Sequence, residues 1–314
     1  MRLPKMTKYK CLSLMSGGLD SMLAVKILKD EGIEVTPICF KSFFFSCGSA
    51  EKGAKQIGLK LRIVDFGKEH LKMLKNPEYG RGSGINPCID CHLLMIKTAG
   101  KIMKKEGFDF IATGEVLGQR PMSQNMQSLN LIERKSGLEG LIVRPLSLKV
   151  LKETIPEKKG MFKRENFYGI SGRGRNKQIA LAKRFKIKEY PAPAGGCILT
   201  DKNYSNNLFK LFKLKEKADG NDCLLLKFGR IFFKSDLLIV VARDEKECNE
   251  LTKLRKKRDV VLEPHNFSGP TVLVRRYKKS PRNKMIDCAI EYVYQYSKNV
   301  PDDFILKLLP SPKS

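Results

Sequence analysis

Residues 16–21 read Ser16-Gly17-Gly18-Leu19-Asp20-Ser21 and stand between two apolar stretches of different periodicity. The preceding stretch, residues 10–15 (KCLSLM), has the composition of a buried strand. The following stretch has apolar residues at helical spacing and closes at Gly32. Two adjacent glycines permit a tight turn with inward-pointing N–H groups, and a helix N-terminus adds partial positive charge. The six residues therefore predict a phosphate-binding loop between a strand and a helix.

Strands and helices alternate from this loop to about residue 146. The expected elements are strands at residues 33–40, 59–66, 108–114 and 141–146, and helices at 50–57 and 89–106. Such alternation predicts an α/β fold with a doubly wound parallel sheet.

The composition of the chain changes after about residue 149, where basic residues become frequent. Between Lys149 and Lys188 there are 13 Lys or Arg and three acids, and this segment includes the basic loop 171–178 (SGRGRNKQ). Further on, residues 223–243 predict two or three short antiparallel strands, and the sequence predicts helices at 244–258 and 283–298. We therefore expect two domains: 1–200 with the parallel sheet, and 201–314 as a smaller α+β domain.

The chain is strongly basic, with 60 Lys and Arg against 33 Asp and Glu and a formal net charge of +27. Such an excess predicts a polyanionic partner, with nucleic acid first, although a merely solvated lysine-rich surface is the alternative. The sequence shows neither a secretory leader nor an apolar run long enough to span a bilayer. We expect a cytoplasmic protein without a membrane partner; the oligomeric state, including a homodimer, stays open.

The loop at 16–21 is neither a Walker A sequence nor G-x-G-x-x-G; it resembles the S-G-G-x-D-S signature of the PP-loop ATP pyrophosphatases. Members of that superfamily generally adenylate a carbonyl oxygen and release pyrophosphate. The resemblance implies ATP binding by Ser16, Gly17, Gly18, Leu19, Asp20 and Ser21. Asp20 is also of the right type to hold Mg²⁺ against the phosphates. The alternative is a small-residue turn with Ser16 as the helix cap.

Residues 112–133 (ATGEVLGQRPMSQNMQSLNLIE), followed by LIVRPLS, resemble the T-G-E-x-L-G-Q…S-Q…R-P-L pattern of 4-thiouridine synthetases. Their start also matches the A-T-G-H of 2-thiouridylases. The resemblance places five residues at or near the nucleotide pocket: Thr113, Gly114, Gly118, Gln119 and Arg144. Phe40, in the second expected strand, is a further candidate for that pocket. A helix cap at Thr113 followed by a glycine turn is the alternative.

Residues 86–92 (NPCIDCH) contain a C-x-x-C-H motif at the start of an expected helix, and Cys197 ends the Pro/Ala/Gly run 190–197. In 2-thiouridylases an N-P-D-x-x-C segment and a later cysteine occupy similar places, with Cys88 here replacing the aspartate. Cys88, Cys91 and Cys197 resemble the three ligands of the iron–sulfur-dependent tRNA thiolases. Those enzymes hold a [4Fe–4S] cluster and leave its fourth iron open, and thiolates suit such clusters.

Other interpretations of the cysteines stay open. A persulfide relay needs only Cys91 and Cys197, and a zinc site could be completed by His92 or Cys47. Covalent haem, a thioredoxin-like dithiol and plain core cysteines are further alternatives, whereas a disulfide framework is not expected. The cysteines expected in the core are Cys11, Cys39, Cys223, Cys248 and Cys288. The three histidines, His70, His92 and His265, are scattered and predict no catalytic triad.

Residues from about 215 to 300 resemble the NFACT-R type of RNA-binding domain. Together the resemblances imply an ATP-dependent tRNA uridine thiolase with Asp20, Cys91 and Cys197 as catalytic residues. Its expected partners are tRNA and a sulfide or persulfide donor. The T-G-E-x-L-G-Q pattern favours 4-thiouridine, whereas the N-P-x-x-x-C context favours 2-thiouridine at the wobble position. A non-catalytic RNA-binding factor with a degenerate PP-loop is the alternative of a different class.

Overall fold

The computed structural model describes residues 9–192 and 197–312 of the chain. The chain divides into two compact units, Met1–Cys197 and Ile198–Ser314. No helix in the described part is both long and apolar enough to cross a membrane.

The first unit is built on a five-stranded parallel sheet in the order β3-β2-β1-β4-β5. Its strands are β1 (Lys10–Leu14), β2 (Glu34–Lys41), β3 (Arg62–Asp65), β4 (Phe110–Thr113) and β5 (Ile142–Val143). Its α-helices are α1 (Leu19–Asp30), α2 (Gly48–Gln56), α3 (Gly67–Lys75), α4 (Cys88–Glu106), α5 (Met126–Ser136), α6 (Ile155–Lys158) and α7 (Asn176–Arg184). Two 3₁₀ turns, η1 (Leu148–Val150) and η2 (Arg164–Asn166), connect the later elements.

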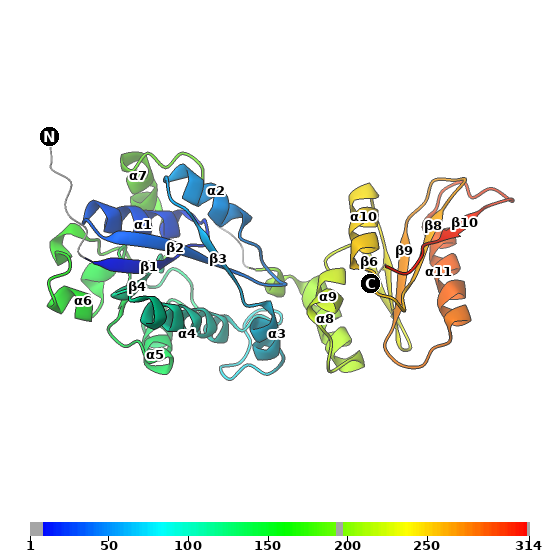
Figure 1. Ribbon diagram of the computed structural model, residues 1–314, viewed down its shortest axis with the longest axis horizontal. Helices are drawn as coiled ribbons and strands as arrows, with labels where there is room; N and C mark the ends of the chain where they lie inside the picture. The colour runs from blue at the N-terminus through cyan, green and yellow to red at the C-terminus, as the bar shows by residue number, and fades with distance from the viewer. Residues whose placement is uncertain (1–8, 193–196, 313–314) are drawn as a thin grey trace. The chain divides into compact units, whose positions relative to one another are not determined.

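Helices cover both faces of this sheet, α1, α2 and α7 on one side and α4 and α5 on the other (Figure 1). Successive residues of a strand face opposite sides, and β1 follows this rule. Cys11 belongs to the core that includes Val25 of α1, whereas Leu12 belongs to the core that includes Ile96 of α4. The predicted doubly wound α/β fold is therefore confirmed.

The strand order reverses between β1 and β4, which are neighbours in the sheet although α1 to α4 separate them in sequence. In open α/β sheets, ligands bind outside the carboxyl ends of the strands at such a point. The loop after β1 and the segment after β4 therefore meet where the fold favours a ligand.

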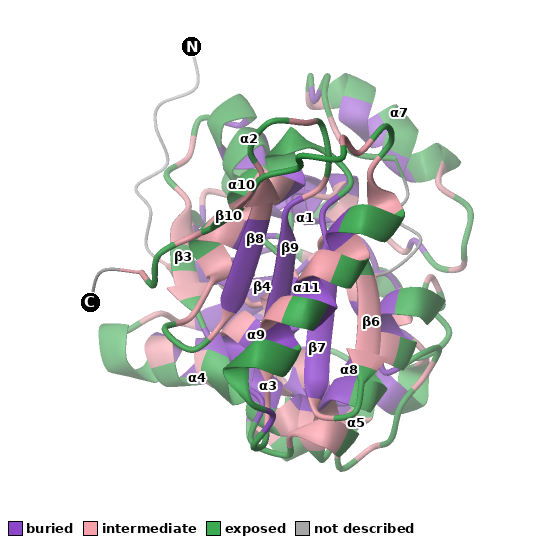
Figure 2. Cartoon of the chain, turned by 90° about the vertical axis from the view of Figure 1, so that its right-hand side faces the viewer, coloured by how far each residue is buried: buried purple, intermediate pink, exposed green. Residues whose placement is uncertain are grey.

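The second unit is an antiparallel sheet in the order β10-β8-β9-β7-β6 with helices around it. Its strands are β6 (Arg230–Lys234), β7 (Leu237–Val241), β8 (Val260–Pro264), β9 (Val272–Arg276) and β10 (Leu306–Leu308). It begins with a 3₁₀ turn, η3 (Ile198–Thr200). Its α-helices are α8 (Lys202–Leu214), α9 (Gly220–Leu225), α10 (Glu245–Leu254) and α11 (Arg282–Tyr296). Figure 2 shows β7, β8 and β9 largely buried, with exposed residues along α11. The predicted smaller α+β unit is confirmed in its fold.

One part of the second unit differs from the expectation of strands from residue 223 onward. Cys223 to Leu225 lie in α9, and only β6 and β7 form strands within 223–243. The reason is local: Asp219 and Asp222 form a capping box that starts the helix just before the apolar run. A short apolar run does not by itself distinguish a strand from a helix turn.

A disulfide joins Cys39, near the end of β2, to Cys47, which precedes α2. Cys39 is buried in the core, as expected, but it is bonded to Cys47. The alternative of Cys47 as a completing zinc ligand was wrong, because its sulfur is in this disulfide. The two residues are brought together because the chain turns directly from β2 into α2, leaving their Cα atoms 6.1 Å apart. Of the other cysteines expected in the core, Cys11, Cys223 and Cys288 are buried and Cys248 is half-buried.

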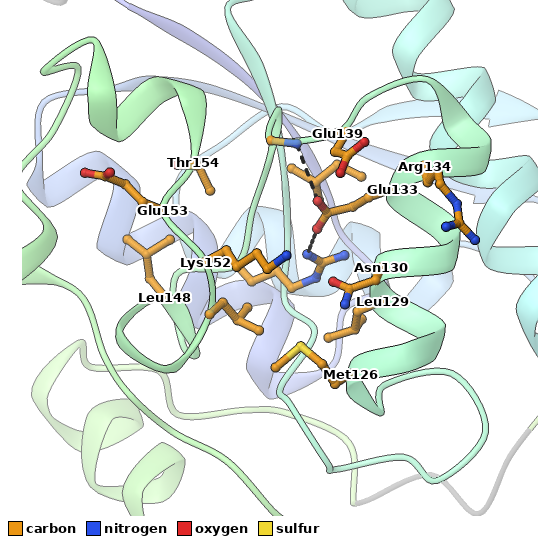
Figure 3. A pocket seen from close by; sticks show the side chains of 14 residues that line it. Met126, Leu129, Asn130, Glu133, Arg134, Glu139, Leu148, Lys152, Glu153 and Thr154 are labelled. Atoms are coloured by element: carbon orange, nitrogen blue, oxygen red, sulfur yellow. Dashed lines mark hydrogen bonds and ion pairs between the residues drawn. The ribbon is translucent and has the colours of Figure 1, made fainter.

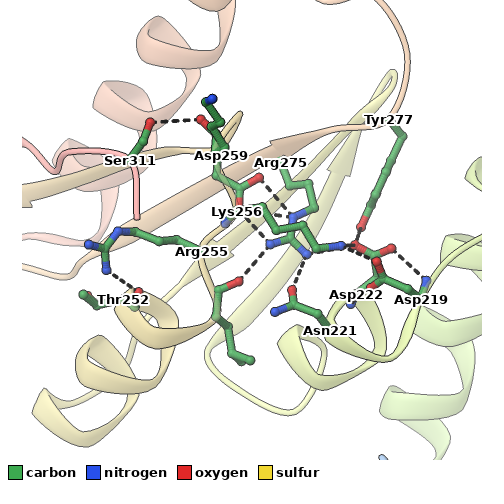
Figure 4. A network of polar contacts seen from close by, with 12 residues as sticks. Asp219, Asn221, Asp222, Thr252, Arg255, Lys256, Asp259, Arg275, Tyr277 and Ser311 are labelled. Atoms are coloured by element: carbon green, nitrogen blue, oxygen red, sulfur yellow. Dashed lines mark hydrogen bonds and ion pairs between the residues drawn. The ribbon is translucent and has the colours of Figure 1, made fainter. Parts of the chain in front are cut away.

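A buried network of charges lies in the second unit (Figure 4). Arg275, 3% exposed, donates to Asp222 at 2.8 Å and to Asp259 at 2.7 Å. Lys256 adds a contact to Asp222 at 3.1 Å. Burial alone would raise the pKa of Asp222, but the Asp219 backbone N–H, Lys256 and Arg275 outweigh it and lower the pKa to about 2. Asp222 therefore stays ionised while buried, and Arg275 is the cation that contacts both buried carboxylates.

We predict that Arg275→Leu destabilises the second unit by about 3–5 kcal/mol, because it leaves two buried carboxylates without their shared cation. Amide hydrogen exchange of β7 and β9 in the full chain measures the loss. Lys234→Ala is the control, since Lys234 forms an exposed pair with Glu291 and such pairs contribute about 0–1 kcal/mol. Equal losses in the two variants would contradict the prediction.

Candidate functional site

The predicted phosphate loop joins β1 to α1 in close contact with the start of α2. Gly17 has a φ of +82°, and a Cβ there would lie 2.2 Å from the carbonyl carbon of Ser49. Only glycine satisfies both conditions. Ser21 closes the loop by donating from its hydroxyl to the Gly18 carbonyl at 2.8 Å. The loop is thus held by packing, with the first turn of α1 following directly from it.

The end of β4 packs against that first turn of α1. A Cβ on Gly114 would lie 2.5 Å from the Ser21 nitrogen and 2.6 Å from the Asp20 carbonyl carbon. The glycine is therefore required by the close approach of two backbones. Thr113, buried at the end of β4, precedes it. The structure brings these residues of the predicted nucleotide pocket into contact with the phosphate loop.

Asp20 and Gln119 form a pair of oxygen donors beside the loop. The Gln119 side-chain amide donates to Asp20 Oδ2 at 2.8 Å. Asp20 Oδ1 and Gln119 Oε1 are buried without a hydrogen-bond partner. Buried polar atoms without partners are rare, and Mg²⁺ prefers oxygen ligands. These two residues therefore fit a magnesium ion bound with a nucleotide phosphate.

Glu115 connects β4 to α4. Its two carboxylate oxygens contact His92 Nδ1 at 2.9 Å, Arg144 Nε at 2.9 Å and the Thr113 hydroxyl at 3.0 Å. Burial alone would raise the pKa of Glu115, but Arg144 and His92 outweigh it and lower the pKa to about 2. The sequence showed the T-G-E motif but predicted no role for Glu115, and it offered His92 only as an alternative zinc ligand. The only available signal was that His92 directly follows Cys91.

Arg144, predicted to lie near the nucleotide pocket, is 2% exposed at the carboxyl end of β5. Its guanidinium contacts Glu115 and also Glu133 of α5. It lines a cavity of about 340 Å³ between α5 and residues 148–154 (Figure 3). The structure thus uses Arg144 to hold two carboxylates, and its Nη2 is buried without a partner.

Two other residues of the predicted nucleotide pocket have different surroundings. Phe40 is 4% exposed and lies in the core beneath α4. The centroid of its ring is 5.1 Å from that of Phe66. Gly118 has a φ of +76° and lies against Gly172 of the basic loop. A Cβ added to Gly118 would lie 3.4 Å from the Gly172 nitrogen. Phe40 therefore supports the sheet, whereas Gly118 allows a second segment to approach the site.

Cys88 begins α4 and Cys91 lies in its first turn, where the Asn86 amide donates to Cys88 Sγ at 2.9 Å. Burial, Cys197 and then Cys88 all raise the pKa of Cys91. Cys91 is thus influenced by both of the other thiols. Within the part of the chain described, no three metal-binding side chains are close enough to hold an ion. Gly195 and Gly196, predicted to lead into Cys197, lie outside the described residues.

The donor set suits an iron–sulfur cluster. Three thiols from two segments are soft ligands, and three such ligands would leave one iron of a four-iron cluster without a protein ligand. Burial also raises the pKa of Cys88, although Asn86 opposes it. Protons must therefore leave these thiols when a metal binds, and binding strengthens as the pH rises.

Comparisons with known proteins confirm both resemblances predicted from the motifs. Residues 6–161 match the family described as thiamine biosynthesis protein (ThiI). Residues 229–306 match the family described as NFACT protein RNA binding domain. The two matches fall on the parallel-sheet unit and on the antiparallel-sheet unit respectively.

Curated relatives match the first unit. A probable tRNA sulfurtransferase from Thermococcus kodakarensis is 30% identical over 157 residues, covering 46% of this chain and 38% of the relative. The tRNA-specific 2-thiouridylase MnmA from Geobacter metallireducens is 31% identical over 126 residues, covering 32% of this chain and 33% of the relative. The chain thus spans about a third of the length of the curated relatives it matches. A solved 4-thiouridine synthetase–RNA complex with bound ATP is 24% identical with a TM-score of 0.40, covering 65% of this chain and 50% of that one.

We predict that Gly114→Ala abolishes ATP binding, because the added methyl group collides with the backbone of α1 and displaces the phosphate loop. Equilibrium titration with ATP measures it. Gly107→Ala is the control: Gly107 has a φ of +71° and open space around it, so alanine there strains the backbone by about 1 kcal/mol without touching the site. Unchanged ATP affinity in Gly114→Ala would refute the expected role of this contact.

Proposed function

We propose that this protein is a cytoplasmic, ATP-dependent tRNA uridine thiolase. The observation that carries the proposal is that a phosphate loop and a set of three thiols occur at the same edge of one sheet. Asp20 and Gln119 follow β1 and β4 at this edge, and Cys88 and Cys91 begin α4 there. ATP activation and sulfur transfer both require a common target base, so the two sites must be neighbours.

In the first half-reaction, a uridine carbonyl oxygen attacks the α-phosphorus of ATP, and pyrophosphate leaves. The N–H groups of the loop and of the first turn of α1 would bind the phosphates. Asp20 and Gln119, each with a buried oxygen that has no hydrogen-bond partner, would hold Mg²⁺. The ion would supply positive charge that stabilises the departing pyrophosphate. The chain's main contribution is to hold the base and ATP in line.

In the second half-reaction, hydrosulfide attacks the adenylated carbon. A sulfide donor supplies it directly, whereas a persulfide donor releases it when a thiolate attacks the inner sulfur and forms a disulfide. The carbon–oxygen bond to AMP breaks, AMP leaves with that oxygen, and the sulfur loses its proton. Cys88, Cys91 and Cys197 would hold a [4Fe–4S] cluster, whose open iron can bind sulfide. Cys91 and Cys197 are the thiols assigned to catalysis, and a relay through their persulfides is the alternative chemistry.

The RNA substrate is assigned to tRNA. The net charge of +27 supports a polyanionic partner, and the match of residues 229–306 to an RNA-binding family supports RNA. The T-G-E-V-L-G-Q segment, residues 113–119, favours 4-thiouridine as the product. The N-P-C-I-D-C segment, residues 86–91, and the 2-thiouridylase relative favour 2-thiouridine as the second candidate. Nucleoside analysis of tRNA from a deletion strain distinguishes them by which thiolated base disappears.

We predict that Asp20→Asn lowers tRNA-dependent AMP formation by about 10³-fold, because it removes a carboxylate oxygen from the proposed magnesium site. Asp30→Asn is the control, since Asp30 is exposed at the other end of the same helix. The measurement is AMP and pyrophosphate release from ATP in the presence of tRNA. Native turnover in Asp20→Asn would exclude the assigned role.

We predict that the anaerobically purified protein contains about four irons and four sulfides per chain. Cys88→Ala should lose this iron and thiolation but keep adenylation, because the phosphate loop is a separate structure. Cys248→Ala, a half-buried cysteine on α10, should keep the iron. Iron analysis and absorption spectra are the readouts. Zinc as the bound metal, or full thiolation by Cys88→Ala, would contradict the cluster; the latter would favour a relay between Cys91 and Cys197.

A further inference from the structure

The basic loop of residues 171–178 returns to the carboxyl edge of the parallel sheet. Ser171 forms a parallel bridge with Leu117, and the Gly172 N–H donates to the Leu117 carbonyl at 2.7 Å. Leu117 lies two residues before Gln119, which donates to Asp20. The loop therefore begins beside the segment that completes the proposed ATP site.

Helix α7 runs from this edge toward the opposite one. Beyond its far end, the N–H groups of Lys188 and Glu189 donate to Gln56 Oε1 at 2.6 and 2.9 Å. Gln56 ends α2, a helix whose start lies against Gly17. The N-termini of α1, α2 and α7 thus face the same edge on one side of the sheet (Figure 1). Each contributes partial positive charge there.

The loop carries uncompensated positive charge. Between Glu165 and Glu189 the sequence has no acid and seven basic residues: Arg173, Arg175, Lys177, Lys183, Arg184, Lys186 and Lys188. Arg173 and Lys177 are exposed, and Arg175 is half-buried. None of these three forms an ion pair with an acid in the portion of the chain that is described. The cations at the ligand edge are therefore available to an external anion.

Two features of the loop have no explanation in the packing of the protein itself. A Cβ on Gly174 would meet nothing within 4 Å, so the glycine there leaves its backbone open to close approach. Gln178, in the first turn of α7, is fully buried, yet neither atom of its amide has a hydrogen-bond partner. Arg175 lies three residues before it, on the same side of the helix start, and its Nε is also buried without a partner. Such groups are rare unless a ligand satisfies them.

We propose that residues 171–178 form a second anion site, and that its ligand is a backbone phosphate of the RNA strand carrying the target uridine. This inference rests on the proposed thiolase function. The loop at 16–21 is already assigned to the phosphates of ATP. Arg173 and Lys177 are exposed on the loop at 171–178 and are left for another anion. Guanidinium groups and helix N-termini are strong phosphate-binding groups. A phosphate fixed here would place the adjacent base over the nucleotide, where orientation has a large effect on rate.

The test uses the full chain with Arg173→Ala/Lys177→Ala. The matched control is Lys101→Ala/Lys105→Ala, which removes the same charge from exposed positions near the end of α4 at the opposite edge of the sheet. Loss of charged contacts to phosphate should weaken tRNA binding roughly tenfold or more. The slope of log affinity against log salt should fall by about 2, one for each contact. The control should change neither, and ATP affinity without RNA should be native in both.

Equal effects in the two double variants would overturn the site, because they would report net charge alone. Weaker ATP binding by Arg173→Ala/Lys177→Ala without RNA would also overturn it, by assigning the loop to the nucleotide. Arg173→Lys/Lys177→Arg keeps both charges and should keep the native salt slope. If the unaltered chain formed no AMP with tRNA, the proposed function would fail, while the salt slopes would still decide the RNA contact.

Discussion

The contact between the end of β4 and the first turn of α1 is the constraint on which the candidate site depends. At Gly114 two backbones approach so closely that no side chain fits between them. The contact occurs where the strand order reverses, because only there are the segments after two strands free to face a common ligand. It fixes Asp20 relative to Gln119, and the two residues share a hydrogen bond although 99 positions separate them. The pairing of Asp20 with Gln119 is thus a consequence of backbone packing.

The residue after this glycine extends the constraint to the cysteines. Glu115 is ionised and buried, and a buried charge requires partners that outweigh its loss of hydration. Arg144 supplies one and is itself balanced by Glu133. His92 supplies the other from the first turns of α4, directly after Cys91. The loop at 16–21 and the cysteine-bearing helix are therefore linked through the short segment that follows β4, as the proposed reaction requires.

The sequence predicted the parallel sheet well because its elements have distinct periodicity, and it predicted the phosphate loop because glycines at that spacing have a physical reason. It failed where the outcome depends on residues distant in sequence. No local pattern shows that His92 meets Glu115 or that the loop at Gly172 pairs with Leu117. The Cys39–Cys47 disulfide depends on how β2 turns into α2. At residues 223–225 the apolar run indicated a strand, but a polar capping box stabilises the start of helix α9 instead.

Phosphates and cysteine thiolates differ in what they require at this edge of the sheet. The proposed phosphate sites consist of helix N-termini and of exposed cations, which need no change of protonation to bind a phosphate. The thiols are different, because burial and mutual repulsion raise the pKa of Cys91 even though it lies at a helix N-terminus. Burial also raises the pKa of Cys88, although the Asn86 amide opposes it. The N-terminus of α4 therefore does not outweigh burial at these two cysteines, and a metal bound by them would have to displace their protons.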